Sequence, residues 1–148
     1  MSKPVYHIAI AIVRRQRQYL VTRRSPDSHL GGLWEFPGGK CLPDEPATQA
    51  ALRELREECA VTATTEHCLP TIQHDYGDRI VNITPVICRW QAGSGQALAA
   101  DLCQWVSLDE LRALPMPTAN QRILGALTRD RSGRPPCRPS NNRNDTMP

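Results

Sequence analysis

Residues 38–61, GGKCLPDEPATQAALRELREECAV, determine how the rest of the chain is arranged. On a helix with about 100° per residue, Glu54, Glu57 and Glu58 fall within an arc of roughly 100°. The apolar side chains of this segment gather on a separate face, which contains Ala51, Leu52, Leu55 and Cys59. The stretch therefore predicts a helix over about residues 46–59 that is anchored by its apolar side and projects three carboxylates together.

Three carboxylates held this close repel one another, at a cost of a few tenths of a kcal/mol for an i,i+4 pair such as Glu54 and Glu58. A bound cation would offset that cost. Mg²⁺ and Mn²⁺ suit such a group, because they bind a few carboxylates and take their other ligands from water and substrate phosphates. The alternative is a solvated helix face on which Arg53 pairs with Glu57. The helix by itself leaves both interpretations open.

The spacing of the glycine, glutamate and arginine residues in this stretch resembles the signature of the Nudix hydrolase family. The residues that match are Gly39, Glu45, Arg53, Glu54, Leu55, Glu57, Glu58 and Val61. One position departs from the pattern, because Ala60 stands where the family has a glycine just past the helix end. Alanine in a left-handed conformation costs about 1 kcal/mol more than glycine. We therefore expect this departure to affect how the helix ends.

The resemblance implies roles for the charged residues of the helix. The implied metal ligands are the Gly38 carbonyl, Glu54, Glu57 and Glu58. Glu54 is alternatively the base that activates water, and Arg53 and Glu57 belong to the catalytic group with it. Arg53 would orient a glutamate, and Glu45 would support the site. The expected ion is Mg²⁺, with Mn²⁺ as an alternative, and its task is to neutralise phosphate charge and activate water.

The remaining elements are expected from hydrophobic alternation and turn residues. Residues 5–13 predict a strand with isoleucines on one face and the small Ala9 and Ala11 on the other, facing something bulky. Pro85 would place its own strand at an edge or at a bulge. Other strands are expected at 19–22, around Trp34, and at 66–73, 79–90 and 104–106, with a hairpin turn at 76–78. Further helices are expected after a capping box at Ser107 and after a cap at Thr118.

With the signature helix, this order of elements resembles the Nudix fold, an α/β/α sandwich with a mixed β-sheet in the α+β class. Outside the signature, further matches lie at 22–24 (TRR), His29, 35–40 (EFPGGK), 78–79 (DR), 105–108 (WVSL) and 117–120 (PTAN). These stretches resemble the MutT branch of the family, the 8-oxo-dGTP pyrophosphohydrolases. Asn120, with its paired donor and acceptor, suits recognition of a base edge. The substrate-binding residues implied by this resemblance are Arg24, His29, Phe36, Gly39, Asp78 and Asn120.

The function implied is that of a Mg²⁺-dependent nucleoside triphosphate pyrophosphohydrolase that converts 8-oxo-dGTP to 8-oxo-dGMP and pyrophosphate, which cleans the nucleotide pool and avoids mutation. A pyrimidine nucleotide such as CTP or 5-methyl-dCTP is the alternative substrate. A non-catalytic nucleotide-binding module is the alternative of another class, motivated by Ala60 and Ala99. Ala99 stands where MutT-like proteins carry a further glutamate, and Asp101 is the nearest acidic residue that could replace it.

Length and charge separate a folded part from a tail. The 148 residues fit one domain, expected over residues 1–128. Residues 129–148 form a basic, proline-rich segment that is expected to be disordered. The formal charge of +3 belongs to this tail, since acidic and basic residues balance before it. No stable nucleic-acid partner is therefore expected, and a contact between nucleic acid and the tail arginines is the least favoured alternative.

The six cysteines lack the spacing of a zinc site, and no apolar signal segment opens the chain. No run approaches the roughly 18 apolar residues that a membrane helix needs. We therefore expect a protein of the reducing cytoplasm with no membrane contact. The family resemblance implies a nucleotide as its partner. A monomer is expected in preference to an oligomer.

Overall fold

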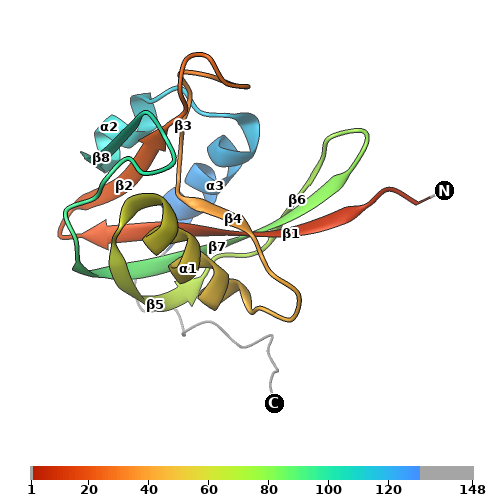
Figure 1. Ribbon diagram of the computed structural model, residues 1–148, viewed down its shortest axis with the longest axis horizontal. Coiled ribbons are helices and arrows are strands. Elements are labelled where there is room, and N and C mark those ends of the chain that lie inside the picture. The colour runs from red at the N-terminus through yellow and green to blue at the C-terminus, as the bar shows by residue number, and fades with distance from the viewer. Residues whose placement is uncertain (1, 131–148) are drawn as a thin grey trace.

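The computed structural model shows one eight-stranded sheet with helices packed against it (Figure 1). It describes residues 2–130, so the disorder predicted for the tail falls almost wholly outside the described residues. The domain boundary predicted at residue 128 stays a prediction. The elements in chain order are β1 (Val5–Arg15), β2 (Gln18–Arg23), β3 (Trp34–Glu35), β4 (Gly38–Lys40), α1 (Ala47–Cys59), β5 (Thr62–Cys68), β6 (Ile72–Asp75), β7 (Ile80–Ala92), β8 (Leu102–Ser107), α2 (Leu108–Ala113) and α3 (Thr118–Arg129).

The central strand of the sheet is β1, whose β-branched residues suit pairing on both edges. It runs parallel to β7 from the Val5–Ile80 pair to the Arg14–Arg89 pair. Its other edge pairs antiparallel with β4 and with β2. β7 pairs further with β5 and β6, and β2 pairs with β3 and β8. The expected α+β class with a mixed sheet is confirmed.

The two faces of β1 carry side chains of different size, and each face packs against its own helices. The small Ala9 and Ala11 lie in one buried cluster with Leu55 of α1. Ile12 lies in a second cluster with Ile123 of α3 and with residues of α2. Because alanine leaves room above the sheet, α1 can approach closely, and burying a leucine such as Leu55 contributes roughly 1.5–3 kcal/mol. The bulky element expected opposite the alanines is therefore α1, and Figure 1 shows it lying across the sheet.

The glycine turn is placed beside α1 by pairing with β1. Gly38 lies opposite Ile10 and Gly39 lies opposite Ala9 in the β1–β4 register. The Ala11 N–H extends this pairing by donating to the carbonyl of Pro37 over 2.8 Å. The chain then turns directly into α1, so the turn and the acidic helix lie against each other.

The ends of α1 follow from Pro46 and Ala60. Pro46 was predicted to be the first helical residue. It is instead the N-cap residue, with ψ 148°, and the helix begins one residue later, at Ala47. Ala60 adopts the left-handed conformation, with φ 55° and ψ 38°, and its N–H donates to the carbonyl of Arg56. The helix thus ends in the geometry that favours glycine, although this chain has alanine there.

The strand predicted over residues 66–73 is wrong. Of the two positions predicted for Pro85, an edge or a bulge, the edge is wrong, and the pairing opposite Pro85 is irregular. β7 lies inside the sheet, and its partner on one side is broken into β5 and β6. The Pro85 carbonyl accepts the N–H of Leu69, which lies in this break. The backbone N and O of a strand residue point to the same side. The nitrogen of Pro85, which carries no hydrogen, therefore also points toward the gap between β5 and β6. A central strand thereby accommodates a proline without losing a regular ladder bond.

The smaller expectations have mixed outcomes. The capping box at Ser107 is confirmed, because its side chain accepts the Glu110 N–H and the Glu110 side chain accepts the Ser107 N–H. Thr118 is not a cap, since Pro117 takes the N-cap position of α3. The turn at 76–78 is confirmed by the Tyr76 N–H, which donates to the Arg79 carbonyl. No helix among residues 2–130 is long and apolar enough to span a membrane.

Ala60→Gly should raise the free energy of unfolding by up to about 1 kcal/mol, because glycine adopts the left-handed conformation without a Cβ clash. Urea denaturation followed by circular dichroism measures the change. The matched control is Ala47→Gly, the same substitution at the other end of the same helix, which should destabilise the protein because glycine is a poor helix former. Equal effects of the two substitutions would contradict this explanation.

Candidate active site

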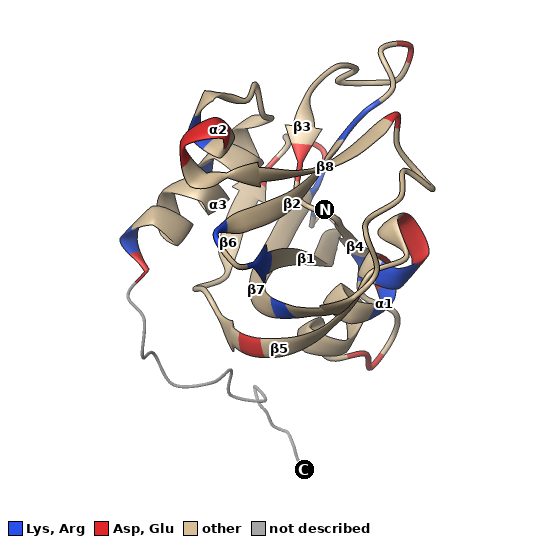
Figure 2. Ribbon diagram, turned by 90° about the vertical axis from the view of Figure 1, so that its left-hand side faces the viewer, with Lys and Arg blue, Asp and Glu red and all other residues tan. Residues whose placement is uncertain are grey.

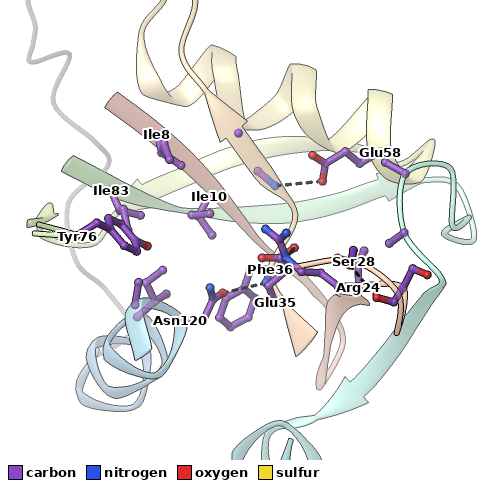
Figure 3. A pocket seen from close by; sticks show the side chains of 18 residues that line it. Ile8, Ile10, Arg24, Ser28, Glu35, Phe36, Glu58, Tyr76, Ile83 and Asn120 are labelled. Atoms are coloured by element: carbon purple, nitrogen blue, oxygen red, sulfur yellow. Dashed lines mark hydrogen bonds and ion pairs between the residues drawn. The ribbon is translucent and has the colours of Figure 1, made fainter. Parts of the chain in front are cut away.

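A cavity of about 450 Å³ lies beside the sheet and connects the acidic helix with α3. At one end it is lined by Glu58, Gly38 and Gly39, and at the other by Asn120 and Tyr76. Figure 3 shows Glu58, Asn120 and Tyr76 around a shared space, coming from α1, α3 and the β6–β7 turn. One cavity can therefore hold a ligand that is charged at one end and flat or apolar at the other.

Arg53 organises the carboxylates of α1. Its Nε donates to Glu45 Oε2 over 2.9 Å, and one terminal nitrogen donates to Glu45 Oε1 over 3.0 Å. The other terminal nitrogen donates to Glu54 Oε2 over 3.2 Å and to Glu57 Oε1 over 3.1 Å. The Lys40 carbonyl accepts a further bond of 3.0 Å. Figure 2 shows basic and acidic residues side by side on α1.

These contacts stabilise the charged form of both main partners. Hydrogen bonding to Glu45 raises the pKa of Arg53, and hydrogen bonding to Arg53 lowers the pKa of Glu45. A bidentate arginine–carboxylate pair is among the stronger hydrogen-bonded contacts in proteins. Arg53 therefore contacts three glutamates, and Glu45 holds it in place. Its orienting role in catalysis stays a prediction.

Glu54 requires the glycine at position 39. A Cβ atom placed on Gly39 would lie 2.4 Å from Glu54 Oε2. Any side chain there would push this carboxylate out of its position. Glu57, by contrast, has a side chain that is 58% exposed and reaches Arg53 at the solvent edge. The three carboxylates are thus held differently, although they share one side of α1.

Glu58 lines the cavity and forms no ion pair with a basic residue among residues 2–130. Its Oε1 accepts the N–H of Gly38 over 3.3 Å. Burial raises the pKa of Glu58 to about 8, and the nearby carboxylates of Glu54 and Glu35 add to the effect. A carboxyl group in this situation is stabilised by any cation that enters the cavity.

These residues fit a divalent metal of the hard type. Among residues 2–130, no three His, Cys, Asp or Glu side chains gather closely enough to hold a metal ion by themselves. Mg²⁺ does not need such a cage, because it keeps several waters and takes ligands from substrate phosphates. Two observations fit a metal-binding role for these carboxylates. Burial raises the pKa of Glu58, so its charged form would be stabilised by a cation, and Glu54 is held closely against Gly39.

The other end of the cavity is built around Asn120. This buried side chain accepts the Phe36 N–H through Oδ1 over 3.2 Å. Within the described part of the chain, its Nδ2 makes no hydrogen bond to a protein acceptor. The sequence predicted a paired donor and acceptor for the base. In the structure the Phe36 N–H takes one lone pair of the acceptor, and recognition of a base by Asn120 stays a prediction.

Of the other residues predicted to bind substrate, some line the cavity and others do not. Arg24 lines the cavity and pairs through Nε with Glu35 Oε2 over 3.1 Å. His29 lies outside the cavity lining, and its backbone carbonyl accepts a hydrogen bond from Arg24 over 3.5 Å. Asp78 also lies outside the lining, with a side chain that is 77% exposed and paired with Arg79.

Ala99 lines the cavity, as its place in the sequence suggested, but Asp101 does not replace a missing carboxylate there. Asp101 forms an ion pair with Arg23, and its N–H donates to the Arg23 carbonyl. Both contacts tie it to β2 and away from the cavity. The idea that Asp101 substitutes at the site is therefore not supported.

The sequence analysis missed several residues that line the cavity. Glu35 precedes the glycine turn by three positions, so its acidic side chain next to Phe36 was an available signal. Tyr76 gave no local signal, because only the pairing of β6 with β7 brings its turn to the cavity. The apolar wall comes from separate elements and includes Ile8, Ile83 and Ile123.

A mixed sheet between helical layers, with an acidic helix beside a glycine turn, defines the class as that of Nudix domains. The chain belongs to the Nudix family, since the family model described as NUDIX domain matches residues 8–126. It is a Nudix hydrolase of the MutT type, as the sequence predicted, because relatives named 8-oxo-dGTP diphosphatase align with most of it.

The similar proteins differ in the substrates that they are named for. A CTP pyrophosphohydrolase of Escherichia coli (strain K12) is 34% identical over 128 residues, covering 86% of this chain and 95% of the relative. An 8-oxo-dGTP diphosphatase of the same strain is 32% identical over 124 residues, covering 82% and 95%. The solution structure of the E. coli ORF135 protein aligns with a TM-score of 0.78 at 31% identity, covering 90% of this chain and 95% of that chain.

Glu58 should make the stability of the metal-free protein depend on pH. Its folded-state pKa of about 8 lies above the ordinary value of 4.5, so the protonated form favours folding and stability falls as pH rises between these values. Glu58→Gln removes this titration. We expect the difference in unfolding free energy, wild type minus variant, to decrease as the pH rises from about 5 to about 8. The decrease should be at most a few kcal/mol. Urea denaturation with a chelator present measures this, and parallel pH profiles would contradict it.

Proposed function

We propose that this protein hydrolyses 8-oxo-dGTP to 8-oxo-dGMP and pyrophosphate in a Mg²⁺-dependent reaction, with Mn²⁺ as an alternative ion. The observation that carries the proposal is the single cavity that joins Glu58 and the glycine turn to Asn120 and Phe36. The phosphates would lie at the first end and the base at the second. In the cytoplasm, such an activity would remove an oxidised precursor before it enters DNA.

Glu54, Glu57 and Glu58, together with the Gly38 carbonyl, are the residues that would hold the metal. When bound, the ion would neutralise phosphate charge, lower the pKa of water and favour attack on phosphorus. Arg53 keeps Glu54 and Glu57 in place, which limits their mutual repulsion before the substrate arrives. Glu54 is either a ligand or the base that takes a proton from the attacking water.

Base recognition would rest on the free donor of Asn120. Its Nδ2 can donate to a carbonyl oxygen of an oxidised guanine, while Phe36 keeps the amide plane fixed through its N–H. Arg24 lines the same cavity and supplies a positive charge beside the glycine turn. Gly39 leaves space for a phosphate to approach the backbone.

A pyrimidine nucleotide is the second substrate to consider, because the relative that is 34% identical over 86% of this chain is named CTP pyrophosphohydrolase. Cytosine also carries a carbonyl oxygen that the Asn120 donor could bind. A non-catalytic binding module is disfavoured, since the chain keeps Glu54, Glu57 and Glu58 in spite of their repulsion.

A comparison of substrates tests the proposed activity. Purified protein with Mg²⁺ should hydrolyse 8-oxo-dGTP with a higher kcat/KM than dGTP, CTP or 5-methyl-dCTP, because the base end is proposed to fit the oxidised purine. Chromatography of the products should show a nucleoside monophosphate and pyrophosphate. A preference for CTP would replace the substrate proposal, and release of orthophosphate from intact nucleotide would contradict the bond assigned.

Glu54→Gln should lower kcat by about 10²-fold or more, since it removes a charged oxygen that would act as base or metal ligand. Mn²⁺ titration monitored by electron paramagnetic resonance separates these roles, because weaker Mn²⁺ binding identifies a ligand and unchanged binding identifies a base. The matched control is Asp109→Asn, which changes a carboxylate that is 95% exposed on α2. Unchanged turnover in Glu54→Gln would remove Glu54 from the mechanism.

A further inference from the structure

Tyr76 presents an aromatic ring at the end of the cavity that is distant from the carboxylates. Tyr76 as a whole residue is 46% exposed, and it lines the same cavity as Asn120. Figure 3 shows Tyr76 and Ile83 on the side of Asn120, with Glu58 across the cavity. A partly exposed aromatic ring in a cavity wall gains free energy when a flat apolar ligand covers it.

The ring is held in place by neighbours that leave part of it available. The Arg79 guanidinium lies over the ring at 4.5 Å from its centroid. The His74 ring contacts it edge-on, with centroids 4.4 Å apart and an interplanar angle of 60°. Asp78 pairs with Arg79 and so supports this arrangement from outside the cavity.

The turn that carries the ring is also fixed. The Tyr76 N–H donates to the Arg79 carbonyl, and the Gly77 N–H donates to Asp75 Oδ1 over 2.8 Å. Asp75 in turn pairs with Lys3 of the N-terminal segment. A ring on such a turn loses little conformational entropy when it binds a ligand.

The direction of the ligand follows from the charges of the cavity. Phosphates are expected at the glycine turn, where a bound cation would neutralise both them and Glu58. The base of the same nucleotide then lies toward Asn120, next to Tyr76. An aromatic side chain can stack on a base without reading its hydrogen-bonding edge, so Tyr76 and Asn120 can act on one base together.

We propose that Tyr76 is a specificity-determining residue, whose ring stacks on the substrate base while Asn120 binds the edge of that base. The inference rests on the proposed nucleotide hydrolysis and extends it to the β6–β7 turn. A larger base covers more of the ring, so Tyr76 favours purine over pyrimidine nucleotides. It also gives Asp78 an indirect role, as a residue that positions Arg79 behind the ring.

Tyr76→Ala and Tyr76→Leu test the inference against Tyr76→Phe, which keeps the aromatic face. Calorimetric titration with 8-oxo-dGMP should show affinity losses of roughly ten- to a hundredfold for the alanine and leucine variants and less than about threefold for phenylalanine. Inorganic pyrophosphate, titrated with Mg²⁺, should bind all variants equally, because it has no base. CMP should lose less affinity than 8-oxo-dGMP.

Leu30→Ala is the matched control, since Leu30 is 43% exposed and lies outside the cavity lining. It should leave the affinity for 8-oxo-dGMP unchanged. Equal affinity of wild type and Tyr76→Leu for 8-oxo-dGMP would overturn the inference, as would an equal loss of pyrophosphate binding. If the wild-type protein instead prefers CMP and still loses affinity in Tyr76→Leu, stacking stands, while the 8-oxo-dGTP assignment and the purine preference both fall.

Discussion

The contacts of Arg53 are the constraint on which the rest of the site depends. A single guanidinium holds Glu45 in the loop before α1, Glu54 and Glu57 on α1, and the carbonyl of Lys40 on β4. Hydrogen bonds to charged groups contribute about 1.5–3 kcal/mol each when they are well formed. Arg53 therefore fixes the acidic helix against the glycine turn and reduces the repulsion between glutamates at the same time. Lysine could not replace it, because its ammonium group lacks the planar arrangement of five donors with which the guanidinium reaches these acceptors.

The sheet brings the two ends of the cavity together. The small Ala9 and Ala11 let α1 approach one face of β1, while Ile10 on the other face of the same strand lines the cavity. α3, near the C-terminal end of the described residues, contributes Asn120 to the same cavity. Glu58 and Asn120 thus line one cavity, although 62 positions separate them in the sequence.

The sequence predicted what depends on neighbouring residues. The periodicity of 46–59 predicted α1 and its acidic side. Arg53 does pair with Glu57, as the interpretation of a solvated face has it, and Glu58 lines the cavity. The interpretation of this side as a metal site stays a prediction. Tertiary placement determined the rest. Pro85 fits within a central strand because the neighbouring strand is interrupted opposite it. Asn120 Oδ1 accepts the Phe36 N–H. Asp101 forms an ion pair with Arg23. Such pairings join residues far apart in sequence, so no local pattern reveals them.

The division of one cavity into a phosphate end and a base end is the central claim about this protein. A crystal structure with Mg²⁺ and a non-hydrolysable analogue of 8-oxo-dGTP tests it most directly. We expect the ion at Glu58 and the glycine turn, and the base between Asn120 and the ring of Tyr76. An ion bound away from α1, or a base lying outside the cavity with Asn120 Nδ2 still free, would contradict the claim.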